Sequence, residues 1–427
     1  MNTKQTKLHF WGGLDTIGGN ILEVRYNNSR VIFDFGRAYD PSDTILTNAK
    51  GREASRVADM LKLGLLPKID GIYSKKDVED LIPAEEDTFE TAIFISHLHL
   101  DHFGNVDAPA PSVPIYMSND GKELLLTLME LGEPPFAHKE ALRGMEYEKP
   151  VQIGDITVTC YLTDHDVHGS TAMLIETPEI KIAFSGDIRL HGPAPETTRH
   201  WMAEMRAKTV DYLLMEGTTF FPPAPEGEPV KEFVQIYEND LMPMFTERLA
   251  ETAGLGIFNI YHTNIHRLQG ILNLNRTVVL EPATAKIAAK FLPQAKFLVL
   301  GQDITPQEIN QNPGQYFLQN SFANVLNLID YNLEDSLYIH SNGTPLGAFD
   351  PNYGSLLAFL QKLGVKYEYI GLSGHGNKEA VLEIIDQVAP KVMVPWHSKS
   401  RGTMIPKNLD QIVLMVEEGK WYTHGEF

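Results

Sequence analysis

The segment Ala92-Ile93-Phe94-Ile95-Ser96-His97-Leu98-His99-Leu100-Asp101-His102 joins a short apolar run to a loop rich in metal-ligating side chains. The apolar half predicts a buried strand. In an extended chain, positions two apart share a side, so His97 and His99 can face one metal ion while a turn brings Asp101 and His102 toward a second. Three histidines and one aspartate within six positions favour a metal site over an ordinary polar surface loop.

One loop cannot close a two-metal site, so further ligands are expected at other strand ends. His165 lies in Thr163-Asp164-His165-Asp166-Val167-His168, after a predicted strand. Asp187 follows another predicted strand, and a carboxylate at such a turn can bridge two cations, although a single aspartate beside glycine is more often an ordinary turn residue. His397 follows an apolar run that ends in Trp396. Alone, it would more often be a buried core histidine than a ligand.

Composition indicates a folded protein with room for more than one domain. The chain has 427 residues, of which 43% are apolar and 22% are charged, which excludes a disordered or low-complexity chain. There are 36 basic and 56 acidic residues, which give a formal net charge of −20. That balance disfavours non-specific coating of nucleic acid by the whole surface. A nucleic-acid partner must therefore be held at a local site.

Cysteine usage and hydropathy indicate the compartment. Cys160 is the single cysteine, which excludes an intrachain disulfide and every cysteine-rich zinc module, and fits a reducing environment. The first residues lack the apolar core of a signal peptide, and no window approaches the roughly 18 uninterrupted apolar residues that a membrane span needs. We expect a cytoplasmic protein with no membrane partner, whose metal ligands are histidines and carboxylates.

The pattern of predicted secondary structure changes along the chain. The first half is strand-rich, with a hairpin over 20–34 and a polar insertion over 40–90 that carries one helix near 56–66. Further elements of this half are strands at 92–96, 113–117, 156–163, 172–176, 180–185 and 212–215, and helices at 119–131 and 200–208. Pro222-Pro223-Ala224-Pro225-Glu226-Gly227 marks a linker.

Beyond the linker, helices and strands alternate strictly, which predicts a parallel sheet with crossover helices. The expected helices are 231–251, 265–274, 284–292 and 354–363, and the expected strands are 256–261, 278–280, 297–300 and 336–340. After Gly364, two further strand ends are expected to carry His375 and His397. The segment is predicted to be a separate α/β domain.

The ligand series resembles that of the metallo-β-lactamase superfamily, in the segment from His97 to His102, then His165, then Asp187. Asp34 after Val31-Ile32-Phe33 matches the supporting N-terminal aspartate of that family. The later chain resembles the β-CASP branch of nucleic-acid-processing members, which includes ribonuclease J. This second resemblance is carried by Glu216 in Leu213-Leu214-Met215-Glu216-Gly217-Thr218, His375 in Leu372-Ser373-Gly374-His375, His397 in Val394-Pro395-Trp396-His397-Ser398, and the phrases Thr263-Asn264-Ile265-His266-Arg267 and Asn342-Gly343-Thr344-Pro345.

The resemblance implies an α/β architecture, an αβ/βα metallo-β-lactamase sandwich interrupted by an inserted α/β cap. Residues 1–218 and 370–427 would form one discontinuous domain, and residues 219–369 would form the β-CASP cap. In the family pattern His97, His99 and His165 hold one ion. Asp101, His102 and His397 hold the other, and Asp187 bridges them. A mixed imidazole and carboxylate site suits two divalent ions, Zn²⁺ first, with Mn²⁺ and Fe²⁺ as alternatives.

Such a pair of cations supports phosphodiester hydrolysis by an activated water. The resemblance assigns catalytic roles to Asp101 and Asp187 at the metals, to His375 as the general acid for the leaving oxygen, and to Glu216 as its orienting partner. Substrate phosphate is expected at the helix N-terminus formed by Ser373, Gly374, Gly376 and Asn377. Helix capping by Ser373 or Asn377 explains the same residues equally well. His266, Arg267 and Arg401 are candidate backbone-phosphate contacts, with a salt bridge as the commoner fate.

Three functions remain open at this stage. The first is a β-CASP ribonuclease with RNA as its substrate, in exonuclease or endonuclease mode. The second is a hydrolase of a smaller phosphodiester or ester, favoured by the acidic balance. The third is a non-catalytic RNA-binding paralogue, disfavoured because no ligand position is substituted. The resemblance also leaves homo-oligomer formation open.

Overall fold

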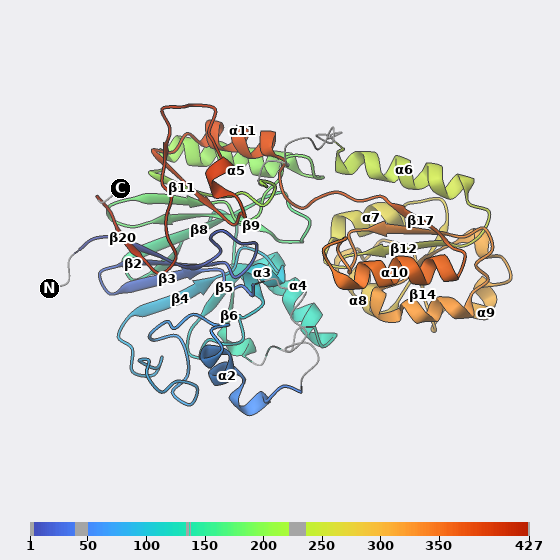
Figure 1. Ribbon diagram of the computed structural model, residues 1–427, viewed down its shortest axis with the longest axis horizontal. Coiled ribbons are helices and arrows are strands. Elements are labelled where there is room, and N and C mark those ends of the chain that lie inside the picture. The colour runs from blue at the N-terminus through green and yellow to red at the C-terminus, as the bar shows by residue number, and fades with distance from the viewer. Residues whose placement is uncertain (1–3, 39–49, 134–135, 137, 222–235, 426–427) are drawn as a thin grey trace.

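The computed structural model describes residues 4–38, 50–133, 136, 138–221 and 236–425. Figure 1 shows two units side by side, a sandwich of two sheets and a smaller α/β unit. Both ends of the chain lie at the sandwich, while the smaller unit is built from the middle of the chain. The predicted linker at 222–227 lies outside the described residues.

The first sheet of the sandwich has seven strands in the order β20-β1-β2-β3-β4-β5-β6. Its strands are β1 (Lys7–Gly12), β2 (Ile21–Tyr26), β3 (Ser29–Phe33), β4 (Glu90–Phe94), β5 (Ile115–Ser118), β6 (Leu142–Met145) and β20 (Trp421–Thr423). The predicted hairpin is β2 and β3, which pair antiparallel. From β3 to β6 the strands run parallel. The sheet thus collects its parallel strand ends at one edge.

The second sheet also has seven strands, in the order β19-β18-β11-β10-β9-β8-β7. They are β7 (Val151–Ile153), β8 (Ile156–Leu162), β9 (Thr171–Glu176), β10 (Lys181–Phe184), β11 (Tyr212–Glu216), β18 (Val392–Trp396) and β19 (Ile412–Val413). Here β10, β11 and β18 are parallel neighbours. A strand from the end of the chain therefore lies beside strands from its middle.

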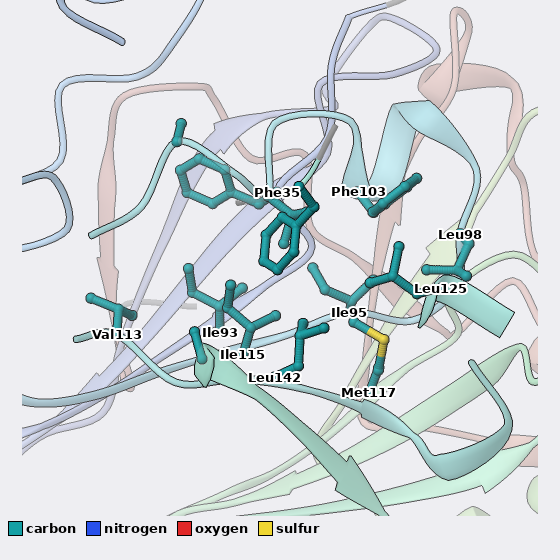
Figure 2. Close-up of a cluster of buried hydrophobic side chains, with 14 of the residues drawn as sticks. Phe35, Ile93, Ile95, Leu98, Phe103, Val113, Ile115, Met117, Leu125 and Leu142 are labelled. Carbon is teal, nitrogen blue, oxygen red and sulfur yellow. The ribbon is translucent and has the colours of Figure 1, made fainter. Parts of the chain in front are cut away.

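Alternate residues of the inner strands are buried on opposite faces, because both faces of each sheet are covered. In β4, Phe94 faces the core between the sheets, where its ring lies 5.6 Å from that of Phe33. Ile93 faces the other way, into the core beneath α2 (Arg56–Lys62) and α4 (Asn119–Glu130). Figure 2 shows this second core, in which Ile93 lies with Ile115 and Leu142 of the neighbouring strands.

The outer face of the second sheet is covered by α5 (Pro195–Lys208) and α11 (Lys378–Val388), which lie together above it in Figure 1. Trp201 of α5 and Ile384 of α11 are fully buried in the core under these helices. The order of layers is helices, sheet, sheet, helices. This is the αβ/βα sandwich that the resemblance implies.

The second unit contains a six-stranded parallel sheet in the order β14-β13-β15-β12-β16-β17. Its strands are β12 (Gly256–Ile260), β13 (Thr277–Leu280), β14 (Leu298–Val299), β15 (Tyr316–Gln319), β16 (Leu337–Ser341) and β17 (Lys366–Tyr369). Its α-helices are α6 (Glu238–Glu251), α7 (Ile265–Leu272), α8 (Pro282–Phe291), α9 (Pro306–Ile309) and α10 (Pro351–Lys362). The strict alternation of the sequence thus folds as a parallel sheet flanked by helices. We call this unit the cap, and its boundaries at 219 and 369 stay a proposal.

The structure differs from the sequence analysis at two places in this region. The pattern did not predict β15, a short apolar strand after Pro313-Gly314 that occupies an inner position of the cap sheet. Residues 371–375 were expected to be a strand end but form an irregular loop. The reason is a side-chain contact, since Leu372 donates its backbone N–H to Asn342 Oδ1 at 2.8 Å instead of to a neighbouring strand.

Short helices complete the described residues. They are the α-helical turn α3 (Leu100–Phe103) and the 3₁₀ segments at Glu53–Ser55, Lys139–Ala141, Pro313–Gln315, Phe322–Asp330 and Arg401–Thr403. Within the part of the chain that the structure describes, no helix is long and apolar enough to cross a membrane.

Candidate metal centre and catalytic site

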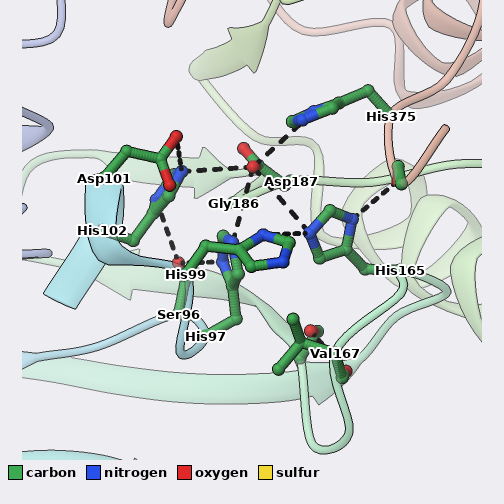
Figure 3. Close-up of polar contacts among 12 residues, drawn as sticks. Ser96, His97, His99, Asp101, His102, His165, Val167, Gly186, Asp187 and His375 are labelled. Carbon is green, nitrogen blue, oxygen red and sulfur yellow. Dashed lines mark hydrogen bonds and ion pairs between the residues drawn. The ribbon is translucent and has the colours of Figure 1, made fainter. Parts of the chain in front are cut away.

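The predicted ligands meet at the edge of the sandwich where the parallel strands end. His97 and His99 follow β4, and the turn α3 that comes next carries Asp101 and His102. His165 follows β8, Asp187 follows β10 and His397 follows β18. Figure 3 shows the side chains of His97, His102 and His165 directed toward Asp187. Segments separated by up to 300 residues of sequence therefore contribute to one cluster.

The first donor group consists of His97, His99, His165 and Asp187, whose potential ligand atoms all lie within 4.8 Å of one another. His165 Nε2 is 3.1 Å from His99 Nδ1, and His97 Nε2 is 3.4 Å from Asp187 Oδ2. Two donor atoms bound to one ion at about 2.1 Å are separated by about 3 Å or slightly more. The group thus has the dimensions of a metal-binding site.

The second donor group consists of Asp101, His102, Asp187 and His397, again within 4.8 Å. His102 Nε2 lies 3.1 Å from Asp187 Oδ2 and 3.7 Å from Asp101 Oδ2. His397 Nε2 lies 3.5 Å from Asp101 Oδ2 and 3.7 Å from Asp187 Oδ1. Asp187 therefore takes part in both groups and lies between them.

Buried atoms without a hydrogen-bond partner support cation binding at both groups. They are His97 Nε2, both carboxylate oxygens of Asp187 and His397 Nε2. Buried polar atoms are almost always hydrogen-bonded in folded proteins, and an unpaired one costs free energy. Four such atoms, two of them the oxygens of Asp187 and two on histidines near it, fit a divalent ion as the missing partner. Imidazole and carboxylate donors without thiolate are ligands that Zn²⁺, Mn²⁺ and Fe²⁺ accept.

Hydrogen bonds on the outer ring nitrogens orient three of the candidate ligands. His102 Nδ1 lies 2.7 Å from Asp34 Oδ2, and His165 Nδ1 lies 2.6 Å from the Gly374 carbonyl. His397 Nδ1 lies 3.0 Å from Asn20 Oδ1. An acceptor at Nδ1 keeps a proton on that nitrogen, so that Nε2 of the neutral ring presents a lone pair to the centre. The same arrangement is common around metal-bound histidines.

Asp34, which the resemblance implies as a supporting aspartate, lies next to His102. Besides its contact to His102, it accepts hydrogen bonds from the Ser96 backbone N–H at 2.7 Å and the Ser96 hydroxyl at 3.0 Å. Asp34 and His397 are both non-glycine residues in the left-handed backbone region, with φ of 59° and 48°. Such conformations cost free energy and cluster at functional sites. Both strand ends are therefore held in conformations that the surrounding contacts must enforce.

The charge states of the cluster depend on burial and on its carboxylates. Burial lowers the pKa of His97 well below its usual value and that of His165 to about 4, so both rings are neutral at pH 7, as metal binding requires. Burial also opposes charge on His102, but Asp187, Asp101 and Asp34 raise its pKa well above the usual value. The carboxylates thus create a negative electrostatic potential at the cluster, which favours binding of a cation.

A third group joins the metal cluster to the loop after β17. His375 Nδ1 lies 3.2 Å from Glu216 Oε1 and 3.6 Å from Asp187 Oδ2. Burial lowers the pKa of His375, but Glu216 and Asp187 outweigh it and raise that pKa to about 10. Glu216 is itself fixed by the Thr218 backbone N–H at 3.0 Å. These carboxylates therefore favour the protonated form of His375, and Figure 3 shows its ring facing Asp187.

The loop that was expected to bind phosphate has its groups mostly engaged. Asn377 caps α11 by accepting the Ala380 N–H at 2.8 Å, which is the capping alternative. Gly376 donates its N–H to the Ile188 carbonyl at 2.8 Å. Ser373 Oγ accepts the His375 N–H at 3.1 Å, and Gly374 O faces His165. The loop is thus bound to the metal-site loops, and its direct phosphate-binding role stays a prediction.

Two of the predicted phosphate contacts form buried ion pairs, which is the alternative that the sequence analysis named. Arg267 is buried and forms a two-pronged ion pair with Glu238, both contacts at 2.8 Å. Arg401 is buried and pairs with Asp15 at 2.6 and 3.0 Å. Their guanidinium groups cannot face substrate without losing these partners. His266, on the first turn of α7, is exposed.

The sequence did not single out Asn20 or Arg189. Asn20 immediately precedes β2 and contacts two predicted ligands, since its Nδ2 atom lies 3.1 Å from His102 Nε2 as well as near His397. Arg189 is fully buried beside the loops of His165 and His375. Only the position of Arg189 two residues after Asp187 offered a signal. The contact of Asn20 depends on tertiary structure alone.

The sequence is similar to one protein family over part of the chain and to several known proteins over most of it. Residues 82–236 match the family described as Beta-lactamase superfamily domain. Ribonuclease J from Pyrococcus abyssi is 25% identical over 430 residues, covering 92% of this chain and 90% of that protein. Ribonuclease J from Mycoplasma genitalium is 22% identical over 435 residues, covering 95% of this chain and 70% of that protein.

A crystal structure of a protein of unknown function from Enterococcus faecalis V583 is similar in fold. It superposes with a TM-score of 0.83 at 28% sequence identity, and the match covers 98% of this chain and 100% of that one. The sandwich and the cap therefore recur together in one solved chain.

Proposed function

We propose that this chain, which contains a metallo-β-lactamase superfamily domain and is similar to ribonuclease J over most of its length, is a metal-dependent ribonuclease. Its substrate would be RNA, and its reaction the hydrolysis of a phosphodiester bond by an activated water at a two-metal site. The observation that carries the proposal is the pair of four-residue donor groups that share Asp187. A shared carboxylate between two groups is the arrangement that a pair of bridged cations requires.

In the proposed site His97, His99 and His165 hold one cation. Asp101, His102 and His397 hold the second, with Asp187 between them. When bound, two such ions lower the pKa of a shared water and offset charge on the phosphoryl oxygens during in-line attack. The protein keeps the donors oriented, because the outer ring nitrogens of His102, His165 and His397 are held by hydrogen bonds.

His375 is the proposed general acid. The leaving oxygen of a cleaved phosphodiester needs a proton, and a protonated imidazole facing the cluster can give it. Glu216 fixes the ring and keeps the proton on it, since its Oε1 atom lies 3.2 Å from His375 Nδ1. Cations on the Asp187 side would partly offset the effect of the carboxylates and make the proton easier to release.

The test compares two substrates after reconstitution with Zn²⁺ or Mn²⁺. One is a 5′-monophosphorylated single-stranded RNA, and the other is a small chromogenic phosphodiester. Wild type is compared with Asp187→Ala and with Asp155→Ala, which removes an exposed carboxylate in the turn between β7 and β8. We expect metal-dependent RNA cleavage by wild type and Asp155→Ala, and a loss of at least a hundredfold in Asp187→Ala.

The other functions give different results in the same assay. Cleavage of the small diester without cleavage of RNA would assign the site to a smaller phosphodiester. Metal binding without cleavage of either substrate would indicate a non-catalytic paralogue. Either result would overturn the ribonuclease proposal.

A further inference from the structure

A chain of buried charges runs from the metal-site loops into the cap. Arg189 Nε lies 3.1 Å from Asp164 Oδ1, next to His165, and Arg189 Nη1 lies 3.5 Å from Glu238 Oε2 at the start of α6. Glu238 in turn makes its two-pronged pair with Arg267 of α7. All four side chains are at most 7% exposed. The charges alternate in sign, so that each buried ion has a partner.

Arg189 also holds two backbone carbonyls that belong to the proposed site. Its Nη1 donates to Ser373 O at 3.0 Å, two residues before His375, and its Nη2 donates to His165 O at 3.4 Å. The loop carrying Arg189 contacts the same segment again, since Gly376 donates to Ile188 O at 2.8 Å. One guanidinium therefore bridges the loop of a proposed metal ligand and the loop of the proposed general acid.

The loop over 371–377 connects the last strand of the cap, β17, to α11 of the sandwich. Hydrogen bonds from both units are therefore required to fix its position. On the cap side, Asn342 holds the Leu372 N–H at 2.8 Å and accepts from Arg267 Nη1 at 2.6 Å. On the sandwich side, Arg189 holds Ser373. The position of His375 relative to Asp187 is thus determined from both units.

We propose that Arg189 is a positioning residue of this site, which fixes the His375 loop against the His165 loop and, through Glu238, ties both to the cap. The inference rests on the proposed function for its catalytic consequence, but not for its structural one. A buried ion pair adds little net stability and is costly to break. Its value here is geometric, because a planar fork of donors can span two carbonyls and a carboxylate, whereas a lysine ammonium cannot.

The experiment compares Arg189→Lys with Arg276→Lys in the full chain. Arg276 is a matched control, because it donates to the carbonyls of Leu249 and Gly254 inside the cap and contacts none of the site loops. Three quantities are measured on protein reconstituted with Zn²⁺: metal ions bound per chain, deuterium uptake of peptides covering 371–377, and kcat and KM for single-stranded RNA.

For Arg189→Lys we expect the wild-type metal content, faster deuterium uptake over 371–377, and a kcat at least tenfold lower with KM little changed. Arg276→Lys should leave uptake in that loop and kcat at wild-type values. Unchanged uptake over 371–377 in Arg189→Lys would overturn the proposal. Equal losses of kcat in both variants would overturn it as well.

The deuterium-uptake result stands apart from the function. If wild type cleaves no RNA, the ribonuclease proposal fails, while the uptake of 371–377 still decides whether Arg189 fixes the loop. If Arg189→Lys does not fold, Asp164→Asn replaces it, since this variant removes the charge paired with Arg189 Nε and leaves the Glu238–Arg267 pair intact. Faster uptake over 371–377 in Asp164→Asn supports the proposal, and unchanged uptake overturns it.

Discussion

At the scale of single residues, the site is distinguished by what lies behind each ligand. Asp34, Asn20 and the Gly374 carbonyl each occupy the outer nitrogen of one histidine. Local spacing indicated the candidate ligands of the first loop, because His97, His99, Asp101 and His102 lie within six positions. The outer partners were mostly not predictable, since Asn20 and Gly374 reach the site only through folding.

Asp34 provides a direct test of this outer layer. Replacing Asp34 by alanine removes the acceptor at His102 Nδ1 and the anchor of the Ser96 hydroxyl. We expect the affinity for the second metal ion to fall by about 10- to 100-fold, the usual effect of losing such a partner. Isothermal titration with Zn²⁺ measures this, with Asp155→Ala as the control. If Asp34→Ala bound both metal ions with wild-type affinity, the proposed role of Asp34 would be contradicted.

The general-acid role of His375 predicts a dependence on the leaving group. In His375→Gln, RNA cleavage should fall by about 10²- to 10⁴-fold, because a poor leaving oxygen needs its proton. Cleavage of a p-nitrophenyl diester should fall much less, because p-nitrophenolate departs without one. Metal content should match wild type, which separates this variant from Asp187→Ala. An equal loss on both substrates would argue against proton donation by His375.

At the scale of elements, the irregular loop over 371–377 carries His375, which the sequence analysis expected at the end of a strand. The resemblance assigned His375 to the site, and its Nδ1 atom lies 3.6 Å from Asp187 Oδ2, but the sequence did not indicate the loop that carries it. Gly374 makes the approach feasible, since a Cβ at this position would lie 2.3 Å from Asp166 Oδ1 and 2.7 Å from His165 Cε1. The helix α11 that follows is capped by Asn377. A close backbone contact, rather than sheet pairing, thus fixes this segment.

Two glycine-to-alanine variants test this reading with the same chemical change. Gly374→Ala should displace the loop and lower RNA cleavage by about tenfold or more, because the added methyl group meets the His165 loop. In Gly354→Ala, inside α10, nothing lies within 4 Å of the new Cβ. That variant should keep full activity and gain about 0.5–1 kcal/mol of stability. Urea unfolding and kcat measure both, and equal activity of the two variants would contradict the interpretation.

At the scale of the whole molecule, part of the negative net charge is concentrated at the candidate metal centre. A net charge of −20 disfavours a broad cationic surface, and the carboxylates of Asp34, Asp101 and Asp187 contribute to it from inside one cluster. The resemblance in the motifs predicted the sandwich with its inserted cap. Periodicity alone predicted the alternating half but missed β15, because a four-residue apolar run has no period of its own. The link between the sandwich and the cap through Arg189 and Glu238 could not be predicted from the sequence, because it depends on how the two units pack.

The buried carboxylates also predict that metal stabilises the fold. Without bound cations, the carboxylates of buried Asp187 and partly exposed Asp101 lie close together, and neighbouring histidines offset their charge. A ligand that binds the folded chain stabilises it by mass action, by about 2.7 kcal/mol at a concentration a hundredfold above Kd. Thermal unfolding of chelator-treated protein should therefore shift upward when Zn²⁺ is added back. Asp187→Ala should show little of this shift, since it removes the carboxylate common to both groups. An equal shift in wild type and Asp187→Ala would mean that the added metal binds elsewhere.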